Sequence, residues 1–526
     1  MESVIVIGSG PAAAGCVAGL LANGKKRITV LDIGSRLPAS QLQLVEQAAS
    51  LTIANWSPEL RTALYPNHYE SPNSALPDKL VLGSDYPLAD YGQMSGVSWV
   101  DGKHPNVVSG ALGGFSNIWG GQAYPFSSWA LRKWPDSGRS MPAAYTAIRK
   151  LFPIAGQADS LLEYLPGYGP LSPLPELAVR TQRMLHALQN QQSFLRGFGI
   201  HVGATRVALD STRCVQCGLC NGGCVWDLIF SSRHLFYEWI NQKRITYRDG
   251  IKVESLTETE SGATVNATTR HGEHRTFFAN RIFLGAGAVG TSKIVLNSLP
   301  DLGELMMQEC RQLIVPLMFY RPAPIPQACD TFALGQAGMY FSPLSSQEAF
   351  LQLYPYDPSF VSALPQFMRR YQLPTNTLLR HLAVGLLYFN SEQSPCITIK
   401  PSRLSHHQTQ LELSGTSLSK HAPIVEAAFR QLRIAGKHGG FFPILPLTRV
   451  APAGRSYHWG GQFPYHADST SPLCSDRFGR LSAWRNVHLI DASTFPTLGP
   501  TGFLLTIMAN AYRIATEASL LETNNA

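Results

Sequence analysis

The sequence is poor in charge and has no long apolar run. Only 15% of its 526 residues are charged, whereas 44% are hydrophobic. This balance excludes an intrinsically disordered chain, which combines high charge with low hydrophobicity. No stretch of about 18 apolar residues occurs, so no transmembrane helix is expected. Because the chain exceeds the roughly 250–300 residues at which one core stops growing, we expect two or three domains, or one large α/β domain with insertions.

A secretory leader and a dense basic block are also missing. The first ten residues, MESVIVIGSG, begin with an acidic side chain and enter an apolar run at once, unlike a signal peptide. We therefore expect a cytoplasmic protein. The formal net charge is +8, but the basic residues are dispersed, so nucleic acid is not an expected partner. This charge suits a mildly basic enzyme surface and would favour an acidic or phosphorylated substrate.

The N-terminus carries the pattern of a dinucleotide-binding unit. Residues 4–7 form a β-branched apolar run that predicts a buried strand. A glycine-rich turn follows, then a segment that predicts a helix ending at Gly24. Residues 27–32, RITVLD, predict a second strand that ends at Asp32. Strand, turn, helix, strand and terminal acid thus occur in the order of a nucleotide-binding βαβ unit.

Four residues of this unit have a specific physical role. Gly8 permits a tight turn, and Gly10 lets backbone N–H groups approach a pyrophosphate at the helix N-terminus. Ala13 keeps helix and strand close, and Asp32 is placed to accept hydrogen bonds from ribose hydroxyls. The unit predicts a bound dinucleotide but does not distinguish FAD from NAD.

Three further segments lead to a family resemblance. Residues 109–126 are dense in glycine, residues 281–298 read as strand, Gly/Ala turn and helix, and residues 486–515 read as strand, turn and apolar helix. Together with the N-terminal unit they resemble the glucose–methanol–choline (GMC) oxidoreductases, FAD-dependent alcohol and sugar oxidases and dehydrogenases. The nearest resemblance is to the sugar dehydrogenase and pyranose-oxidase-like members. It covers about half of the chain.

The resemblance implies a non-covalent FAD. Gly113 and Gly114 match the family's flavin-flanking turn, and Ile118 stands where some members attach the flavin through histidine. The positions expected to contact the cofactor are Gly8, Gly10, Ala13, Asp32, Gly113, Gly114, Asn117, Val253, Gly285, Ala286, Asp491, Ala492, Thr501 and Gly502.

The implied fold is α/β, with a Rossmann-type FAD-binding domain assembled from discontinuous segments and an α+β substrate domain built on an antiparallel sheet. We place the FAD-binding domain, with its insertions, at residues 1–300, the substrate domain at 301–450, and the return to the FAD-binding domain at 451–526. The stretches QLIVPLMFY, HLAVGLLYF and CITIKP read as strands and favour a sheet in the middle region.

The resemblance also places a catalytic base. In the family, a hydride moves from the carbinol carbon to the flavin while a histidine takes the hydroxyl proton. An imidazole suits this role because its pKa lies near neutrality, so that the neutral ring can accept a proton. His458 in SYHWGGQFP resembles the H-x-G-G of pyranose-oxidase-like members, although a packed core histidine is the alternative. The second histidine or asparagine of the family is missing, and Thr501 at that place offers only a hydrogen bond. His488, in a predicted strand, is expected to be structural, and His466 is compatible with either role.

Four of the nine cysteines lie in residues 211–227, with spacing C-x2-C-x2-C-x3-C. This spacing is typical of iron–sulfur ligands, although Val225 replaces the usual proline. Some GMC dehydrogenases resemble this chain in a cysteine-rich segment that holds such a cluster. A zinc site and a metal-free loop are the alternatives. The expected ligands are Cys214, Cys217, Cys220 and Cys224, and the other five, Cys16, Cys310, Cys329, Cys396 and Cys474, read as buried small hydrophobes.

The leading hypothesis is an FAD-dependent oxidation of a CH–OH group of a sugar-like or other alcohol, with His458 as base. A cluster would pass electrons to an acceptor protein or a quinone, whereas its absence would favour oxygen and an oxidase. The alternatives are a flavin desaturase or reductase on the same scaffold and a non-catalytic flavoprotein that serves as a binding or electron-transfer subunit.

Overall fold

The computed structural model describes most of the chain. The described residues are 2–24, 27–66, 79–88, 95–100, 102, 106–135, 137–323, 332–342, 348–355, 380–405, 408–467 and 470–520. Cys329, expected to be a buried hydrophobe, lies outside them. In the part described, no helix combines the length and apolarity needed to cross a membrane.

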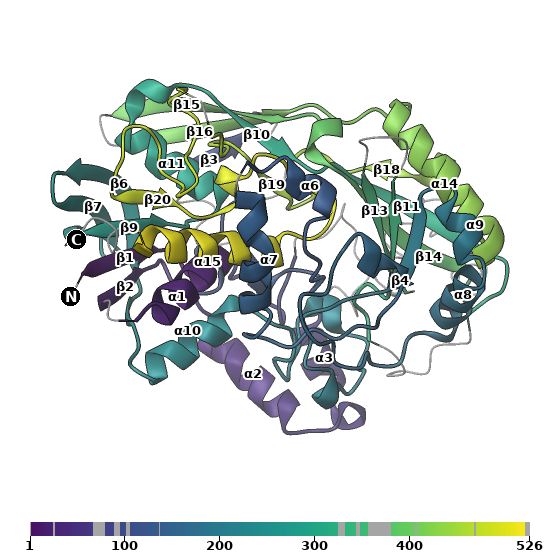
Figure 1. Ribbon diagram of the computed structural model, residues 1–526. Helices are drawn as coiled ribbons and strands as arrows, with labels where there is room; N and C mark the ends of the chain where they lie inside the picture. Colours follow the sequence, from purple (N-terminus) through teal and green to yellow (C-terminus); the bar gives the residue numbers. More distant parts are fainter. Residues whose placement is uncertain are drawn as a thin grey trace.

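A five-stranded parallel sheet is built from strands that lie far apart in the sequence (Figure 1). Its order is β20-β9-β1-β2-β5, and every neighbouring pair is parallel. The strands are β1 (Ser3–Ile7), β2 (Arg27–Leu31), β5 (Thr246–Arg248), β9 (Arg281–Leu284) and β20 (Val487–Leu489). The prediction of a Rossmann-type sheet assembled from discontinuous segments is therefore confirmed.

Two helices pack closely against each other beside this sheet. Helix α1 (Pro11–Ala22) follows the first glycine turn, and α15 (Leu504–Leu520) is the last helix of the described chain. A Cβ at Gly15 would lie 2.1 Å from the backbone oxygen of Met508, so only glycine allows this approach. Helix α1 ends two residues before Gly24, which has φ +67°.

A seven-stranded antiparallel sheet forms the second layer of the molecule, on the right in Figure 1. Helices α14 (Pro423–Gly439), α8 (Val179–Gln189) and α9 (Gln192–Arg196) share a hydrophobic core with one of its faces. Its strands are β17 (Phe441–Pro443), β11 (Gln312–Phe319), β14 (Leu382–Phe389), β13 (Ala349–Tyr354), β12 (Ala337–Phe341), β4 (Ile200–Ala204) and β18 (Arg449–Val450). The predicted antiparallel sheet is confirmed.

The antiparallel sheet takes β4 from within the segment 1–300 that the sequence assigns to the FAD-binding domain. The stretch CITIKP does form a strand, but it belongs to a further sheet, ordered β19-β10-β15-β16-β3. That sheet contains β3 (Val97–Trp99), β10 (Leu305–Glu309), β15 (Ile397–Ser405), β16 (Gln408–Gly415) and β19 (Trp459–Gly460). The exact division into domains stays a prediction.

The remaining elements surround these sheets. A three-stranded meander consists of β6 (Ile251–Thr259), β7 (Gly262–Thr269) and β8 (His274–Ala279). The other α-helices of the described residues are α2 (Ala39–Ala49), α3 (Pro58–Leu64), α6 (Ser128–Arg132), α7 (Ser137–Ile148), α10 (Ser232–Asn241) and α11 (Ala288–Ser298).

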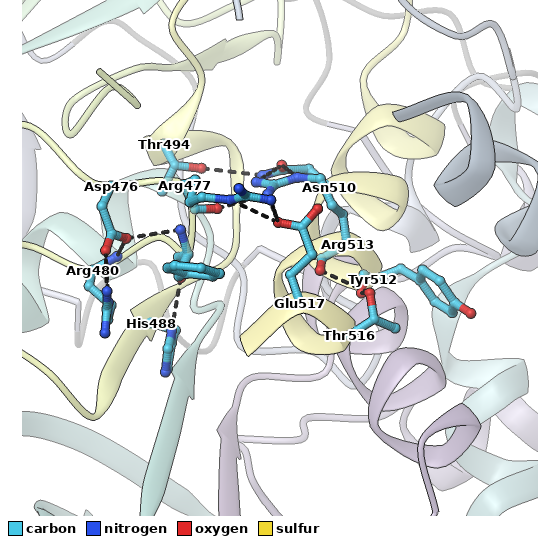
Figure 2. A network of polar contacts seen from close by, with 11 residues as sticks. Asp476, Arg477, Arg480, His488, Thr494, Asn510, Tyr512, Arg513, Thr516 and Glu517 are labelled. Carbon is cyan, nitrogen blue, oxygen red and sulfur yellow. Dashed lines mark hydrogen bonds and ion pairs between the residues drawn. The ribbon is translucent and has the colours of Figure 1, made fainter. Parts of the chain in front are cut away.

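A polar network anchors α15 to the loop that precedes β20 (Figure 2). Arg513 donates to the backbone oxygen of Arg477 at 2.7 Å and pairs with Glu517 at 3.0 Å. The His488 ring lies 2.8 Å through Nδ1 from the backbone oxygen of Phe478 and stacks on Phe283. His488 is also buried, so these contacts agree with the structural role expected for it.

Candidate active site

A cavity of about 520 Å³ lies between the nucleotide-binding unit and the antiparallel sheet. Pro11 at the start of α1 and residues 115–120 of the glycine turn form one side. Residues 218–224, residues 455–458 and residues 502–504 form the other walls. Most of these segments are ones that the sequence marks as cofactor-contacting or catalytic, which fits the placing of ligand sites between domains.

The first glycine turn leaves open space in front of a helix N-terminus. Gly8 has φ +97°, and a Cβ there would lie 2.6 Å from the backbone oxygen of Gly285. Nothing lies within 4 Å of a Cβ built at Gly10, the residue that caps α1. The N–H groups of the first helical turn therefore face space in which an anion would be favoured.

The acid at the end of β2 lies beside this turn. Asp32 is buried, and its Oδ2 accepts hydrogen bonds from Ser9 and, at 2.7 Å, from the hydroxyl of Tyr247. Burial raises the pKa of Asp32 to about 6, against the opposing effect of these hydrogen bonds. Asp32 is mainly ionised at neutral pH and can accept further hydrogen bonds.

The second glycine turn packs on the first. Gly113 and Gly114 have φ of +94° and +54°, and the N–H of Gly113 donates to Ser9 Oγ at 3.0 Å. A Cβ at Gly114 would lie 3.4 Å from the Cα of Gly10. Asn117 donates to the backbone oxygens of residues 112 and 114 and accepts from Ser231. The amide of Asn117 thus holds the turn in shape.

The C-terminal residues expected to contact the cofactor, Asp491 and Ala492, lie in a buried turn next to the segment that carries His458. Asp491 accepts from Thr291 and from the N–H of Ser493, and burial raises its pKa. A Cβ at Gly460 would lie 2.2 Å from the backbone oxygen of Ala492, so the segment after His458 packs closely against the 491–494 turn.

The expected cofactor residues of the turn before α11 lie near the first glycine turn. Gly285 lies beside Gly8, and Ala286 follows Gly285 in the turn before α11. Ala13 is buried in α1.

Val253 lies on β6, two residues after Ile251, whose N–H donates to the backbone oxygen of Asp32 at 2.9 Å. It pairs with Ala267 in the β6–β7 hairpin and belongs to the apolar core beneath the parallel sheet. It does not line the cavity.

His458 is held with one ring edge towards the cavity. The ring lies between Tyr388 and Phe503, with centroid distances of 4.8 and 4.6 Å. Its Nδ1 is fully buried without a hydrogen-bond partner in the described part of the chain. Because both ring faces and Nδ1 are covered, Nε2 is the nitrogen that can meet a ligand.

Burial and the nearby Lys79 lower the pKa of His458 to about 3. The imidazole is therefore neutral at every pH near neutrality. A neutral ring can accept a proton, which is the state that a general base requires.

A buried ion pair positions the segment that carries His458. Glu309 accepts from the N–H of Gly454 at 2.9 Å and from Ser456 Oγ at 2.7 Å, and it pairs with Arg311 at 2.6 Å. Ser456 Oγ in turn accepts from the N–H of His458 at 3.1 Å. Tyr457 has φ +55°, a conformation that costs a residue with a side chain about 1 kcal/mol or more and that occurs often at functional sites.

The inner face of the antiparallel sheet adds residues that the motif analysis missed. Gln312 and Tyr388 are cross-strand partners, and Gln312 Nε2 donates to the Tyr388 hydroxyl at 2.7 Å. Gln352 and Tyr354 lie on β13, and all four side chains line the cavity. Polar residues at alternate positions of otherwise apolar strands were the available signal.

No protein-family model and no curated protein sequence matches the chain. Solved structures do match. Pyridoxine 4-oxidase from Mesorbium loti aligns over 98% of this chain and 99% of its own, at 14% identity and a TM-score of 0.60. An FAD-dependent oxidoreductase from Chaetomium thermophilum, solved with a bound fragment, aligns over 100% of both chains at 13% identity and a TM-score of 0.59.

The fold is that of a GMC-type FAD-dependent oxidoreductase. At these identities the likeness extends to the fold alone. The likeness covers the parallel sheet and the curled antiparallel sheet beside it.

The GMC-type fold does not bring Thr501 to the cavity. The Thr501 hydroxyl donates to the backbone oxygen of Pro125 at 3.3 Å, and the residue is buried. Gly502 does line the cavity, next to Phe503. The structure therefore offers no support for Thr501 as a hydrogen-bonding aid to catalysis. His466 is exposed and does not line the cavity.

The four-cysteine loop borders the cavity through Cys220 and Cys224. Burial raises the pKa of the Cys214, Cys220 and Cys224 thiols, and the other three cysteines of the loop, which lie close to Cys220, raise its pKa further. Within the described ranges, no three His, Cys, Asp or Glu side chains are grouped so as to hold a metal ion. The structure therefore gives no support for an iron–sulfur cluster or a zinc ion in this loop, and both stay predictions.

Proposed function

We propose that the protein is an FAD-dependent oxidoreductase that oxidises the CH–OH group of an alcohol substrate, sugar-like or other, with His458 taking the hydroxyl proton. The observation that carries the proposal is the open Nε2 edge of His458 in a cavity that reaches both glycine turns and the start of α15. FAD, when bound, supplies the acceptor for the hydride.

The residues around the glycine turns fit FAD. The open space at Gly10, before the N-terminus of α1, suits the pyrophosphate. Asp32 suits the ribose hydroxyls because it is buried and mainly ionised at neutral pH. Ile118 lines the cavity and has no nucleophilic atom, so FAD is non-covalent at this position.

His458 accepts the proton while it is neutral. A pKa of about 3 makes the free imidazole a weak base, so we expect the proton to move to Nε2 as the C–H bond breaks. The hydroxyl oxygen of Tyr388 accepts a hydrogen bond from Gln312. Among the described residues, no acceptor is found for the hydroxyl hydrogen of Tyr388. We assign to Tyr388 the hydrogen bond to the substrate oxygen that the sequence assigns to Thr501.

Oxygen is the electron acceptor that we favour. The first comparison structure is named an oxidase, and the four cysteines do not form a ligand group in the described residues. Export of electrons through iron–sulfur to a protein or quinone stays a prediction, as does the cytoplasmic location.

The test is anaerobic flavin bleaching by a panel of primary, secondary, aromatic and sugar alcohols. We expect at least one class to bleach the holoenzyme, and we expect His458→Ala to slow that reaction by about 10²–10⁴-fold, the usual contribution of a general base. His466→Ala is the matched control because His466 is exposed and outside the cavity. If no alcohol class bleaches the flavin, a desaturase, a reductase or a non-catalytic flavoprotein becomes the better account.

A further inference from the structure

Two cationic side chains line the same cavity near His458. Lys79 donates from Nζ to the backbone oxygen of Ile118 at 3.1 Å, and its ammonium lies 4.5 Å from the centroid of the Tyr457 ring. Arg455 precedes Tyr457 by two residues and lines the cavity as well. One N–H of Lys79 is therefore used by the protein, and two remain for a ligand.

These two charges are not balanced. In the part of the chain that the structure describes, neither Lys79 nor Arg455 pairs with a carboxylate. The carboxylate that lines the cavity, Asp227, is already engaged by Arg233 at 2.9 Å and by His234 at 3.0 Å. Enclosed charges without a partner are costly, so an anionic group would be bound favourably here.

The two cations also repel each other. Burial, and secondarily the charge of Arg455, lower the pKa of Lys79 to about 8. An anion between them would relieve this repulsion and would hold Lys79 protonated.

The surrounding wall is aromatic. Phe115 packs on Tyr457 at a centroid distance of 5.8 Å, and both rings line the cavity. Tyr388 and Phe503, which flank His458, line the same cavity. Such a wall favours a planar ring in the cavity.

We propose that Lys79 and Arg455 form an anion-binding subsite, which selects a small ring alcohol that carries a carboxylate or a similar anionic group. The alcohol part of this inference rests on the proposed function. The substrate would present its CH–OH group to His458 and its anionic group to Lys79 and Arg455.

The test measures ligand binding by calorimetry on the FAD-loaded protein, with benzoate and its neutral, equally shaped counterpart benzamide as probes. We expect benzoate to bind about tenfold or more tightly than benzamide, as a charge-assisted hydrogen bond provides. Lys79→Met and Arg455→Gln should each weaken benzoate about tenfold and leave benzamide within twofold. Lys79→Arg, which keeps the charge, should retain most of the preference.

The controls are Lys437→Met and Arg433→Gln, which remove equal charges from the exposed surface of α14 and should change neither affinity. Retained FAD content and Tm establish that each variant is folded. Equal binding of the two probes by the wild type, or no measurable benzoate binding, contradicts the proposal. So does loss of FAD from the Lys79 and Arg455 variants with an unchanged benzoate preference, because the cations would then serve the phosphates of the cofactor.

The outcome is separate from that of the bleaching test, because calorimetry requires no turnover. A benzoate preference without any alcohol that bleaches the flavin would contradict the alcohol chemistry and retain the subsite. Bleaching by neutral alcohols without a benzoate preference would contradict the subsite and retain the alcohol chemistry.

Discussion

At the scale of single residues, Tyr388 offers a test of how the substrate oxygen is held. Tyr388→Phe keeps the ring that covers His458 and removes the hydroxyl that Gln312 orients. We expect kcat/KM to fall about tenfold to a hundredfold, the cost of losing one hydrogen bond to the reacting group. Tyr237→Phe, at an exposed position, is the control. An unchanged kcat/KM in Tyr388→Phe would remove this residue from the mechanism.

His488 links burial to the pH dependence of stability. Burial lowers its pKa to about 4, below the ordinary value near 6.5, so the unfolded chain binds the proton more readily than the folded one. The contribution of His488 to stability is therefore present above pH 6.5 and is lost as the pH falls towards 4. Between pH 7 and 5 the loss amounts to about 2 kcal/mol.

Denaturant unfolding at pH 7 and pH 5 measures this effect. His488→Gln should have a smaller difference in the free energy of unfolding between the two pH values than the wild type. His466→Gln, at an exposed position, should not. The comparison between variants is needed because Asp32, whose pKa is raised, acts in the opposite direction between pH 4 and 6.

At the scale of elements, the contact between α1 and α15 depends on one missing side chain. Gly15→Ala would place a Cβ 2.1 Å from the Met508 oxygen and force the helices apart. We expect a loss of about 1–3 kcal/mol in the free energy of unfolding. We also expect weaker FAD retention, because residues at the start of α1 and of α15 line the cavity. Gly290→Ala in α11, where the nearest atom is at 3.4 Å, is the control and should be close to neutral.

The 454–458 segment depends on a buried carboxylate. Glu309→Gln leaves the Arg311 guanidinium buried without its counter-charge and weakens the hold on Ser456. We expect about 3–5 kcal/mol of lost stability and a lower kcat through displacement of His458. Glu304→Gln, on the exposed surface nearby, tests whether the loss of any carboxylate has this effect. A stable Glu309→Gln variant with full activity would contradict the positioning role.

The elements that could be predicted were those with local signals. The run at residues 4–7 and the turn at Gly8 predicted β1 and the start of α1 because side-chain periodicity and glycine requirements are properties of neighbouring residues. The pairing of β4 with β12 could not be predicted, because it joins strands more than 100 residues apart.

The same limit applied to the site. His458 was found through its neighbours in the sequence, whereas Lys79, Tyr388 and Arg455 come together only through the fold. Thr501 lies next to Gly502 and Phe503, which line the cavity, but its hydroxyl donates to the backbone oxygen of Pro125. Which way a side chain points in an irregular loop is not encoded in local spacing.

At the scale of the whole molecule, the metal content of the protein decides the route of electrons. The cysteine loop shows no ligand group in the described residues. We expect protein purified without oxygen to contain FAD and no stoichiometric iron or acid-labile sulfide. Three or four irons per flavin would instead make the loop a cluster site and would reinstate electron export to a carrier.

At the centre of the proposed function, the molecule joins a hydride-accepting cofactor to a proton-accepting His458 in one cavity. The measurement that tests this most directly is the rate of anaerobic flavin reduction by a bleaching alcohol, with hydrogen or deuterium on the carbinol carbon. We expect slower reduction by the deuterated alcohol in the wild type and a rate lower by about 10²-fold or more in His458→Ala. Equal rates for both isotopes with full activity in His458→Ala would contradict it.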